Sequence, residues 1–282
     1  MVPEASVRVA AGLERTMTKP IVPVVVTVNL QGKTVELSQL GEDALFGRAS
    51  YGKYAYAVGC ERLFGLLDRH GIQSTVFVPG AEAGANPAYI AALAGRGHEI
   101  AAHGWAMEEM DAAGIDERTL LERTHAVLSR IVGHAPRGFR APHGRLTEHT
   151  LGHLADLGYR YDASFQDDDH PYRLDADGGR GMVEVPHAEI LIDATLYGQR
   201  QTHDRVMKMW REEIEAMYRE RCLITLTLHP RSDYGSARAS RIAALDGLLS
   251  WLSGLSGTAF MTCNQISEAA AAGRLRCRTN GN

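Results

Sequence analysis

The 282-residue sequence is poor in cysteine and lacks the common nucleotide-binding motifs. Its four cysteines show no CxxC spacing, so we expect free thiols, as in a cytoplasmic protein. Neither the GxxxxGK[ST] phosphate loop nor the GxGxxG dinucleotide fingerprint is present. A nucleotide cofactor is therefore not expected.

Long apolar segments and runs of like charge are also missing. No stretch approaches the length that spans a bilayer, and the first residues include Glu4, Arg8, Glu14 and Arg15 without the apolar core of a signal peptide. The net charge is only −4, with no basic run that would attract nucleic acid or an anionic membrane surface. We expect a cytoplasmic homo-oligomer that acts on a small molecule and binds neither nucleic acid nor membrane.

What the chain does have is a regular alternation of strand and helix patterns. The run Ile21–Leu30 is nearly continuous in β-branched residues, which is typical of a strand buried on both faces. Helical spacing of apolar residues follows at Ala55–His70 and in several later segments. Lys33–Gly52, between them, is long, polar and glycine-containing, and we interpret it as a functional loop.

Such alternation predicts a mostly parallel sheet with helices outside it, closed into a barrel. No break in composition divides the chain, so we expect a single domain over residues 20–282, preceded by a lead-in at residues 1–19.

Polar residues follow five of the expected strands. They are Asn29 with Gln31, His103, Arg140 with His143, Glu184 and His229. In a parallel barrel the carboxyl ends of the strands meet at one mouth, where catalytic residues gather. Each residue alone has an ordinary explanation, since a histidine at a strand end commonly bonds a backbone carbonyl. Their joint occurrence in this order is the stronger signal.

These segments resemble the polysaccharide deacetylase (NodB-homology) superfamily over roughly Pro20 to Ala272. The resemblance rests on Gly97–Gly104, Arg140-Ala141-Pro142, Glu184-Val185-Pro186 and Leu226-Thr227-Leu228-His229-Pro230. It implies an α/β fold, a distorted (β/α) barrel of the polysaccharide deacetylase type. The acidic stretch Asp167–Tyr172 is similar to the branch that contains cofactor-free allantoinases and cyclic imide hydrolases.

The sequence departs from the metal-dependent members at three positions. Where they carry an aspartate pair after the first strand, this chain has Asn29 and Gln31, and their second histidine is replaced by Met107. Zn²⁺ takes three or four charged or imidazole ligands, and only His103 remains of the implied set. We therefore expect no metal cofactor; if a divalent metal such as zinc is present, His103 is the expected ligand.

The branch resemblance implies hydrolysis of ring amides without a metal. His229 is the candidate general base, because an imidazole titrates near neutral pH. His103 and Asn29 are candidate donors to the developing oxyanion, and Arg140 is expected to orient the substrate. The remaining candidate substrate-binding residues are Gln31, Trp105, His143, Asp168, Asp169 and Tyr172.

Three functions thus compete. The first is metal-independent opening of a small cyclic amide, ureide or imide. The second is a metal-dependent N-deacetylase of an amino sugar that uses a shifted ligand set from His143, His170 or His187. The third is a non-catalytic sugar- or metabolite-binding module, which the missing aspartates would also explain.

Overall fold

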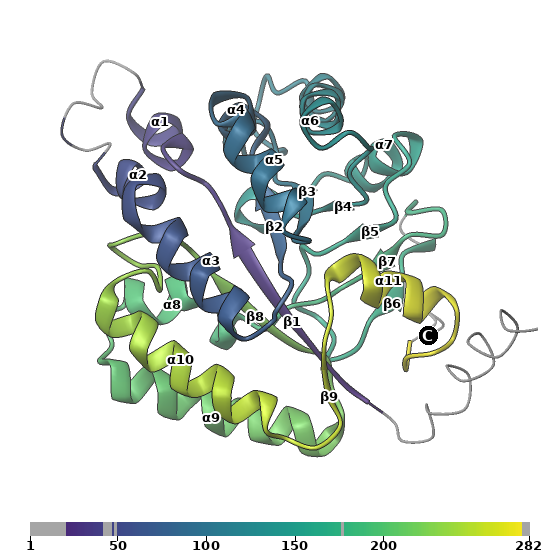
Figure 1. Ribbon diagram of the computed structural model, residues 1–282. Coiled ribbons are helices and arrows are strands. Elements are labelled where there is room, and N and C mark those ends of the chain that lie inside the picture. The colour runs from purple at the N-terminus through teal and green to yellow at the C-terminus, as the bar shows by residue number, and fades with distance from the viewer. Residues whose placement is uncertain (1–20, 42–46, 48–49, 176–177, 278–282) are drawn as a thin grey trace, which may run out of the picture.

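The computed structural model describes residues 21–41, 47, 50–175 and 178–277. Its centre is one curled sheet with helices around it (Figure 1). The strands are paired in the order β6-β7-β5-β4-β3-β2-β1-β8, and β9 pairs with the beginning of β1. Their bounds are β1 Val22–Asn29, β2 Thr75–Val78, β3 Glu99–Ala102, β4 Gly138–Phe139, β5 Tyr161–Asp162, β6 Tyr172–Arg173, β7 Val183–Glu184, β8 Ile224–Leu228 and β9 Thr258–Phe260.

The ends of this sheet approach each other. All strand pairs are parallel except β6 with β7. The segment after β7 returns to β8, where Ile192 forms a parallel bridge with Thr227 and the Thr225 hydroxyl donates to the Pro186 carbonyl at 3.0 Å. The predicted distorted (β/α) barrel is confirmed. The predicted lead-in at residues 1–19 lies outside the described residues.

The predicted helices at Ala55–His70, after Asp116, at His203–Glu220 and at Ser240–Leu252 are confirmed within a few residues. Short helices after β2 and before β8 were not predicted. The bounds are α1 Thr34–Leu40, α2 Ser50–Tyr54, the π-helix η2 Ala55–Gly59, α3 Cys60–Arg69, α4 Gly80–Ala85, α5 Pro87–Gly95, α6 Glu117–Val132, the 3₁₀ turn η3 Pro142–Gly144, α7 Thr150–Asp156, the 3₁₀ turn η5 Glu189–Leu191, α8 Asp193–Gly198, α9 His203–Glu220, α10 Ala239–Ser253 and α11 Cys263–Ala271.

The interpretation of Lys33–Gly52 as a loop is wrong where the structure describes it. Helix α1 follows β1 almost at once, and α2 begins at Ser50. A buried ion pair holds α1: the Arg231 guanidinium donates to both carboxylate oxygens of Glu36. This partner lies 195 residues away in the sequence, so local patterns could not reveal it. Residues 42–46 and 48–49 of the same stretch lie outside the described residues.

Alternation along β1 sorts its side chains between two environments. Every residue of β1 is buried, as predicted. Val25 joins an apolar cluster with Phe77 and Leu223, while Val24 and Val26 belong to the larger cluster under the helices. Because side chains alternate along a strand, Thr27 and Asn29 continue on the same face as Val25. The barrel interior is therefore apolar near the strand beginnings and polar at their carboxyl ends.

The π-helix η2 lies against the loop that follows β8. A Cβ atom built on Gly59 would sit 2.0 Å from the Pro230 carbonyl oxygen, one residue after His229. Gly59→Ala should therefore displace this loop and lower the free energy of unfolding by about 1–3 kcal/mol. Gly65→Ala is the matched control, since its nearest contact would be Arg69 Nη1 at 3.9 Å, and it should stabilise α3 by up to about 1 kcal/mol. Urea unfolding measures both, and equal effects would contradict the proposed close approach.

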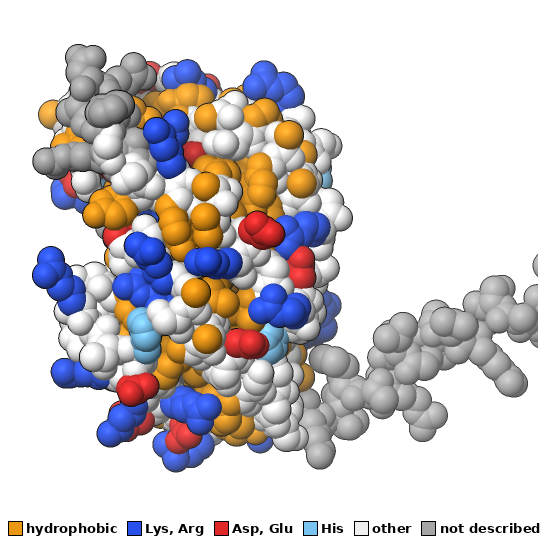
Figure 2. Space-filling model, turned by 60° about the vertical axis from the view of Figure 1, so that its left-hand side comes forward, with side chains coloured by type: hydrophobic (Ala, Val, Ile, Leu, Met, Phe, Trp, Pro, Cys, Tyr) orange, Lys and Arg blue, Asp and Glu red, His pale blue; other side chains and the backbone are white. Residues whose placement is uncertain are grey.

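Figure 2 shows the molecule turned so that the left-hand side of Figure 1 comes forward. On this face, apolar side chains are interspersed with Lys and Arg. Single apolar groups among charges are common on any protein surface, so the predicted homo-oligomer stays a prediction. Within the described ranges, no helix has both the length and the apolarity that a bilayer crossing requires.

Candidate active site

A cavity of about 440 Å³ opens at the carboxyl ends of the strands. Five sequence-predicted residues share it: Asn29 and Gln31 follow β1, His103 follows β3, Arg140 follows β4 and His229 follows β8. His143 joins them from the turn η3. The expectation that these strand ends meet at one mouth is confirmed. The cavity is also lined by Met107, Ala141, Gly144, Ser164, Gln166, His187, Glu189, Ile192, Ala194 and Thr195.

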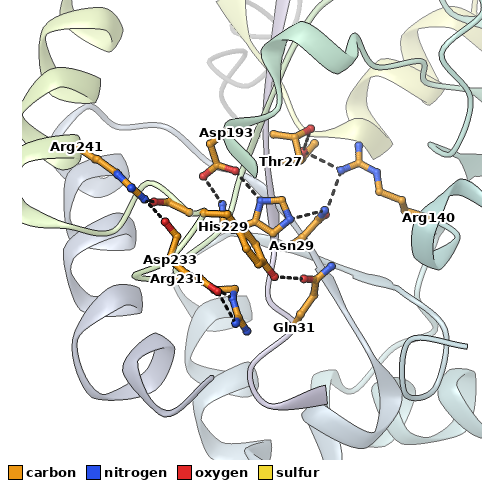
Figure 3. A network of polar contacts seen from close by, with 12 residues as sticks. Thr27, Asn29, Gln31, Arg140, Asp193, His229, Arg231, Asp233 and Arg241 are labelled. Carbon is orange, nitrogen blue, oxygen red and sulfur yellow. Dashed lines mark hydrogen bonds and ion pairs between the residues drawn. The ribbon is translucent and has the colours of Figure 1, made fainter. Parts of the chain in front are cut away.

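His229 is held by a carboxylate that has no exposed surface. Asp193, the first residue of α8, accepts the His229 backbone N–H at 2.8 Å and lies 2.6 Å from His229 Nδ1 (Figure 3). Since a carboxylate only accepts, Nδ1 carries the proton. The other nitrogen, Nε2, lies 3.2 Å from the amide nitrogen of Asn29. An amide N–H₂ only donates, so Nε2 accepts this bond with its lone pair, on the side of the ring that faces the cavity.

Arg140 determines which way the Asn29 amide points. Its guanidinium donates from Nη1 to Asn29 Oδ1 at 3.1 Å and to the Thr27 hydroxyl at 3.0 Å, and from Nε to the Ala163 carbonyl at 2.8 Å. A guanidinium has no acceptor, so the oxygen of Asn29 must face it and the N–H₂ group must face His229. Arg140 is 4% exposed and also lies over the Phe77 ring, 4.2 Å from its centroid.

His103 is a hydrogen-bond acceptor in this cavity. Its Nδ1 donates to the Arg140 carbonyl at 2.8 Å, and burial lowers its pKa to about 3, so the ring is neutral. Nε2 must then accept from the Gln31 amide at 3.2 Å, whose oxygen takes the Tyr234 hydroxyl at 3.3 Å. The prediction that His103 donates to an oxyanion is therefore wrong, because its only N–H is used by a backbone carbonyl.

Two buried carboxyl groups lie beside Arg140 at the ends of β5 and β7. Asp162 and Glu184 face each other in register, and neither is exposed. Burial raises the pKa of Asp162 to about 6. The pKa of Glu184 is raised well above its usual range, mainly by burial and then by the charge of Asp162. Two adjacent carboxylates repel each other, so the pair holds one proton near neutral pH.

The structure separates the other predicted substrate-binding residues from this cavity. Trp105 packs against α4 and is stacked by the Arg123 guanidinium, 3.6 Å from the ring centroid. The Asp169 carbonyl accepts from the backbone N–H of Leu223, just before β8 begins, whereas the cavity lies where β8 ends. Asp168 precedes it and accepts from the His170 backbone.

Tyr172 does not line the cavity either: it pairs with Glu184 at the end of β7, and its hydroxyl donates to Asp167 at 2.9 Å. The expectation that Asp168, Asp169 and Tyr172 line the same cavity as His229 is contradicted. The Asp169 part of the stretch packs near the beginning of β8, a placement that its sequence did not reveal.

Asp193 is the site residue that sequence reasoning missed. It ends an apolar run, Ile190-Leu191-Ile192, and this run was the available signal. His187, which the sequence offered only as an alternative metal ligand, also lines the cavity; burial first and the charge of Arg140 second lower its pKa to about 3. Ser164, which follows β5 and lines the cavity, is not among the sequence-predicted residues either.

The side chains present do not fit a divalent metal. Asn29 and Gln31 turn their oxygens to Arg140 and Tyr234 and their N–H₂ groups, which cannot coordinate, to the two histidines. Met107 lines the cavity as a thioether, a poor ligand for zinc. Among the described residues, no three His, Cys, Asp or Glu side chains group as a metal site. Of the alternative ligands His143, His170 or His187, only His143 and His187 line this cavity, since His170 lies beside Pro171 and Leu223.

Comparison with known proteins agrees with the fold and the motifs. The family model for polysaccharide deacetylase matches residues 53–161. A crystal structure from Mycobacterium smegmatis assigned to the polysaccharide deacetylases is 32% identical, with a TM-score of 0.83 over 94% of this chain and 96% of that one.

Two further proteins are similar at lower identity. The Helicobacter pylori peptidoglycan deacetylase is 25% identical over 255 residues, which cover 78% of this chain and 86% of that protein. The PuuE allantoinase structure has a TM-score of 0.78 over 89% of this chain and 90% of that one, at 19% identity, which shows a shared fold.

Proposed function

Because the chain belongs to the polysaccharide deacetylase family, whose members hydrolyse amide C–N bonds, we propose that it opens a small cyclic amide, ureide or imide without a metal. One observation carries the proposal. His229 Nε2 is unprotonated and its lone pair accepts the Asn29 amide at the cavity, while the buried Asp193 holds Nδ1–H at 2.6 Å. An imidazole arranged in this way is a general base.

The mechanism begins with a water in the cavity that attacks the ring carbonyl. When the ring binds, the water replaces the Asn29 N–H₂ group at His229 Nε2, which takes the proton of this water, and the imidazolium that forms is stabilised by Asp193. The N–H₂ group of Asn29 then donates to the carbonyl oxygen as negative charge develops there. Arg140 bonds the amide oxygen of Asn29, which polarises that amide and strengthens it as a donor. Collapse of the tetrahedral intermediate breaks the ring C–N bond.

Substrate reactivity supports a ring amide over an acetamide. A strained or doubly acylated ring nitrogen makes the carbonyl more electrophilic, so the reaction needs less activation than a metal supplies. The cavity, at about 440 Å³, has the size of an ordinary small-molecule site. We place a hydantoin-, succinimide- or allantoin-sized ring in the cavity against Asn29 and His229.

A substrate panel tests this function. The purified protein should open hydantoin, succinimide or allantoin-type rings faster than it releases acetate from chitooligosaccharides, and elemental analysis should find well under one zinc, cobalt or manganese per chain. Treatment with a chelator should leave the rate unchanged. Acetate release without ring opening, or a rate that chelation abolishes and zinc restores, would reverse the assignment.

A further inference from the structure

Ser164 connects the cavity with the buried carboxyl pair. It follows β5, lines the cavity and is 4% exposed. Its hydroxyl donates to Asp162 Oδ1 at 2.8 Å and accepts the Ala141 backbone N–H at 2.8 Å. Its own backbone N–H donates to Asp162 Oδ2 at 3.2 Å. These bonds give the hydroxyl one direct proton-transfer partner, the carboxyl group of Asp162.

Ser164 and His229 both line the cavity and are connected through Asn29 and Arg140. A chain of contacts leads from His229 to Asn29 at 3.2 Å, on to Arg140 at 3.1 Å, and from Arg140 to the Ala163 carbonyl at 2.8 Å. Ser164 comes directly after Ala163. The guanidinium thus spans the distance between the general base and the serine, and a small ring bound over it faces both.

We propose that Ser164 is a further catalytic residue, which passes a proton from the Asp162–Glu184 pair to the leaving nitrogen. This inference rests on the proposed ring opening. As the C–N bond breaks, its electron pair stays on nitrogen and takes the hydroxyl proton of Ser164. For this step the proton of the pair lies on Asp162 Oδ1, so the 2.8 Å contact is reversed: Asp162 donates its proton to the serine oxygen while the serine hydroxyl donates to the leaving nitrogen, and no free alkoxide forms. Afterwards the carboxyl pair regains a proton from solvent. His229 releases to solvent the proton that it took from the attacking water.

The surroundings of the pair suit this role. Arg140 after β4 is the nearest cation, and the acidic neighbours are Tyr172 on β6 and Asp167 in the loop after β5. Burial makes a second negative charge on the pair costly, so the pair carries a proton at pH values where a lone carboxyl group is ionised. A serine hydroxyl alone is too weak an acid, and the carboxyl behind it supplies the acidity.

The relay predicts a specific dependence on the leaving group. Across a series of cyclic imides and ureides with increasingly basic leaving nitrogens, kcat/KM should fall more steeply for Ser164→Ala than for the unmodified protein. We expect a loss of at least about 10²-fold for the most basic nitrogen and little loss for the least basic one. A purely structural serine would lower all rates equally, and parallel slopes would overturn the relay.

Two variants separate the relay from a folding defect. Ser164→Thr keeps the hydroxyl and should restore the shallow slope, whereas Asp162→Asn should reproduce the steep one. Ser267→Ala is the matched control, since Ser267 is also 4% exposed but bonds the Arg160 carbonyl and does not line the cavity. Its slope should equal that of the unmodified protein.

Infrared spectroscopy tests the proton source without any substrate. The protein near neutral pH should show the C=O stretching band of a buried protonated carboxyl group, which Glu184→Gln removes and Ser164→Ala shifts. Absence of this band would overturn the relay even if the ring-opening activity is found. If the panel fails while the band is present and shifted, the proposed function fails and the serine–carboxyl link stands.

Discussion

Asp193→Asn is expected to lower kcat about 10³–10⁴-fold while the protein stays folded. Asp193 accepts two N–H groups, from the His229 backbone and from Nδ1. An asparagine side chain has a single oxygen, so it can accept a hydrogen bond from only one of these two N–H groups. The backbone N–H is held by the sheet, so the new N–H₂ group faces Nδ1 and forces the proton of the ring onto Nε2. His229 then lacks the lone pair that activates water.

A second Asp–His pair provides the control. His70 Nε2 lies 2.6 Å from Asp246 between α3 and α10, outside the cavity. Asp246→Asn should leave kcat unchanged. Steady-state kinetics on the best ring substrate gives kcat for both variants, and melting temperatures show whether they stay folded. A kcat for Asp193→Asn within tenfold of that of the unmodified protein would refute the general-base role of His229. His229→Ala should match Asp193→Asn or exceed its effect.

His187→Gln is expected to make the protein more resistant to acid. Burial, followed by the nearby charge of Arg140, lowers the pKa of His187 to about 3 from 6.5, so folding favours the neutral ring. The stability gained in this way is present above pH 6.5 and is lost as the pH falls from 6.5 toward 3. At pH 4.5 this loss amounts to roughly 3 kcal/mol, and a protein with glutamine at this position does not undergo it.

The comparison must be made between variants, because the carboxyl pair acts in the opposite sense. The pKa of Asp162 is raised to about 6, so its contribution is present at low pH and is lost as the pH rises through that value. The measurement is denaturant unfolding at pH 7 and pH 4.5 of the unmodified protein, His187→Gln and the exposed His134→Gln. The difference between the variants gives the contribution of His187 to the pH dependence of the free energy of unfolding. Equal changes in all three would show that His187 is not buried as a neutral ring.

Much of the site could be predicted from particular residues. Asn29, Gln31, His103, Arg140 and His229 each follow a short apolar strand, and all five line one cavity. Their convergence could be predicted from the rule that parallel strands end at the same edge of a barrel. The helix predicted from Leu63, Leu66 and Leu67 is also present as α3.

Other predictions failed because they depended on distant partners. The acidic stretch at Asp168 and Asp169 looked as polar as a true site, yet it packs near the beginning of β8. The sequence predicts a loop where α1 lies, because the ion pair with Arg231 that holds this helix is formed across the fold. Polarity alone does not say at which end of a strand a loop will lie.

Local patterns are enough to place these side chains at the barrel mouth, because alternation along a buried strand and the end of that strand are local properties. The chemical role of each side chain depends instead on partners that folding brings to it. Asn29 is turned by Arg140, 111 residues away, and the proton of His229 is placed by Asp193, 36 residues away. A neutral imidazole becomes a base or a donor according to which of its nitrogens meets an acceptor, and that acceptor is brought by folding.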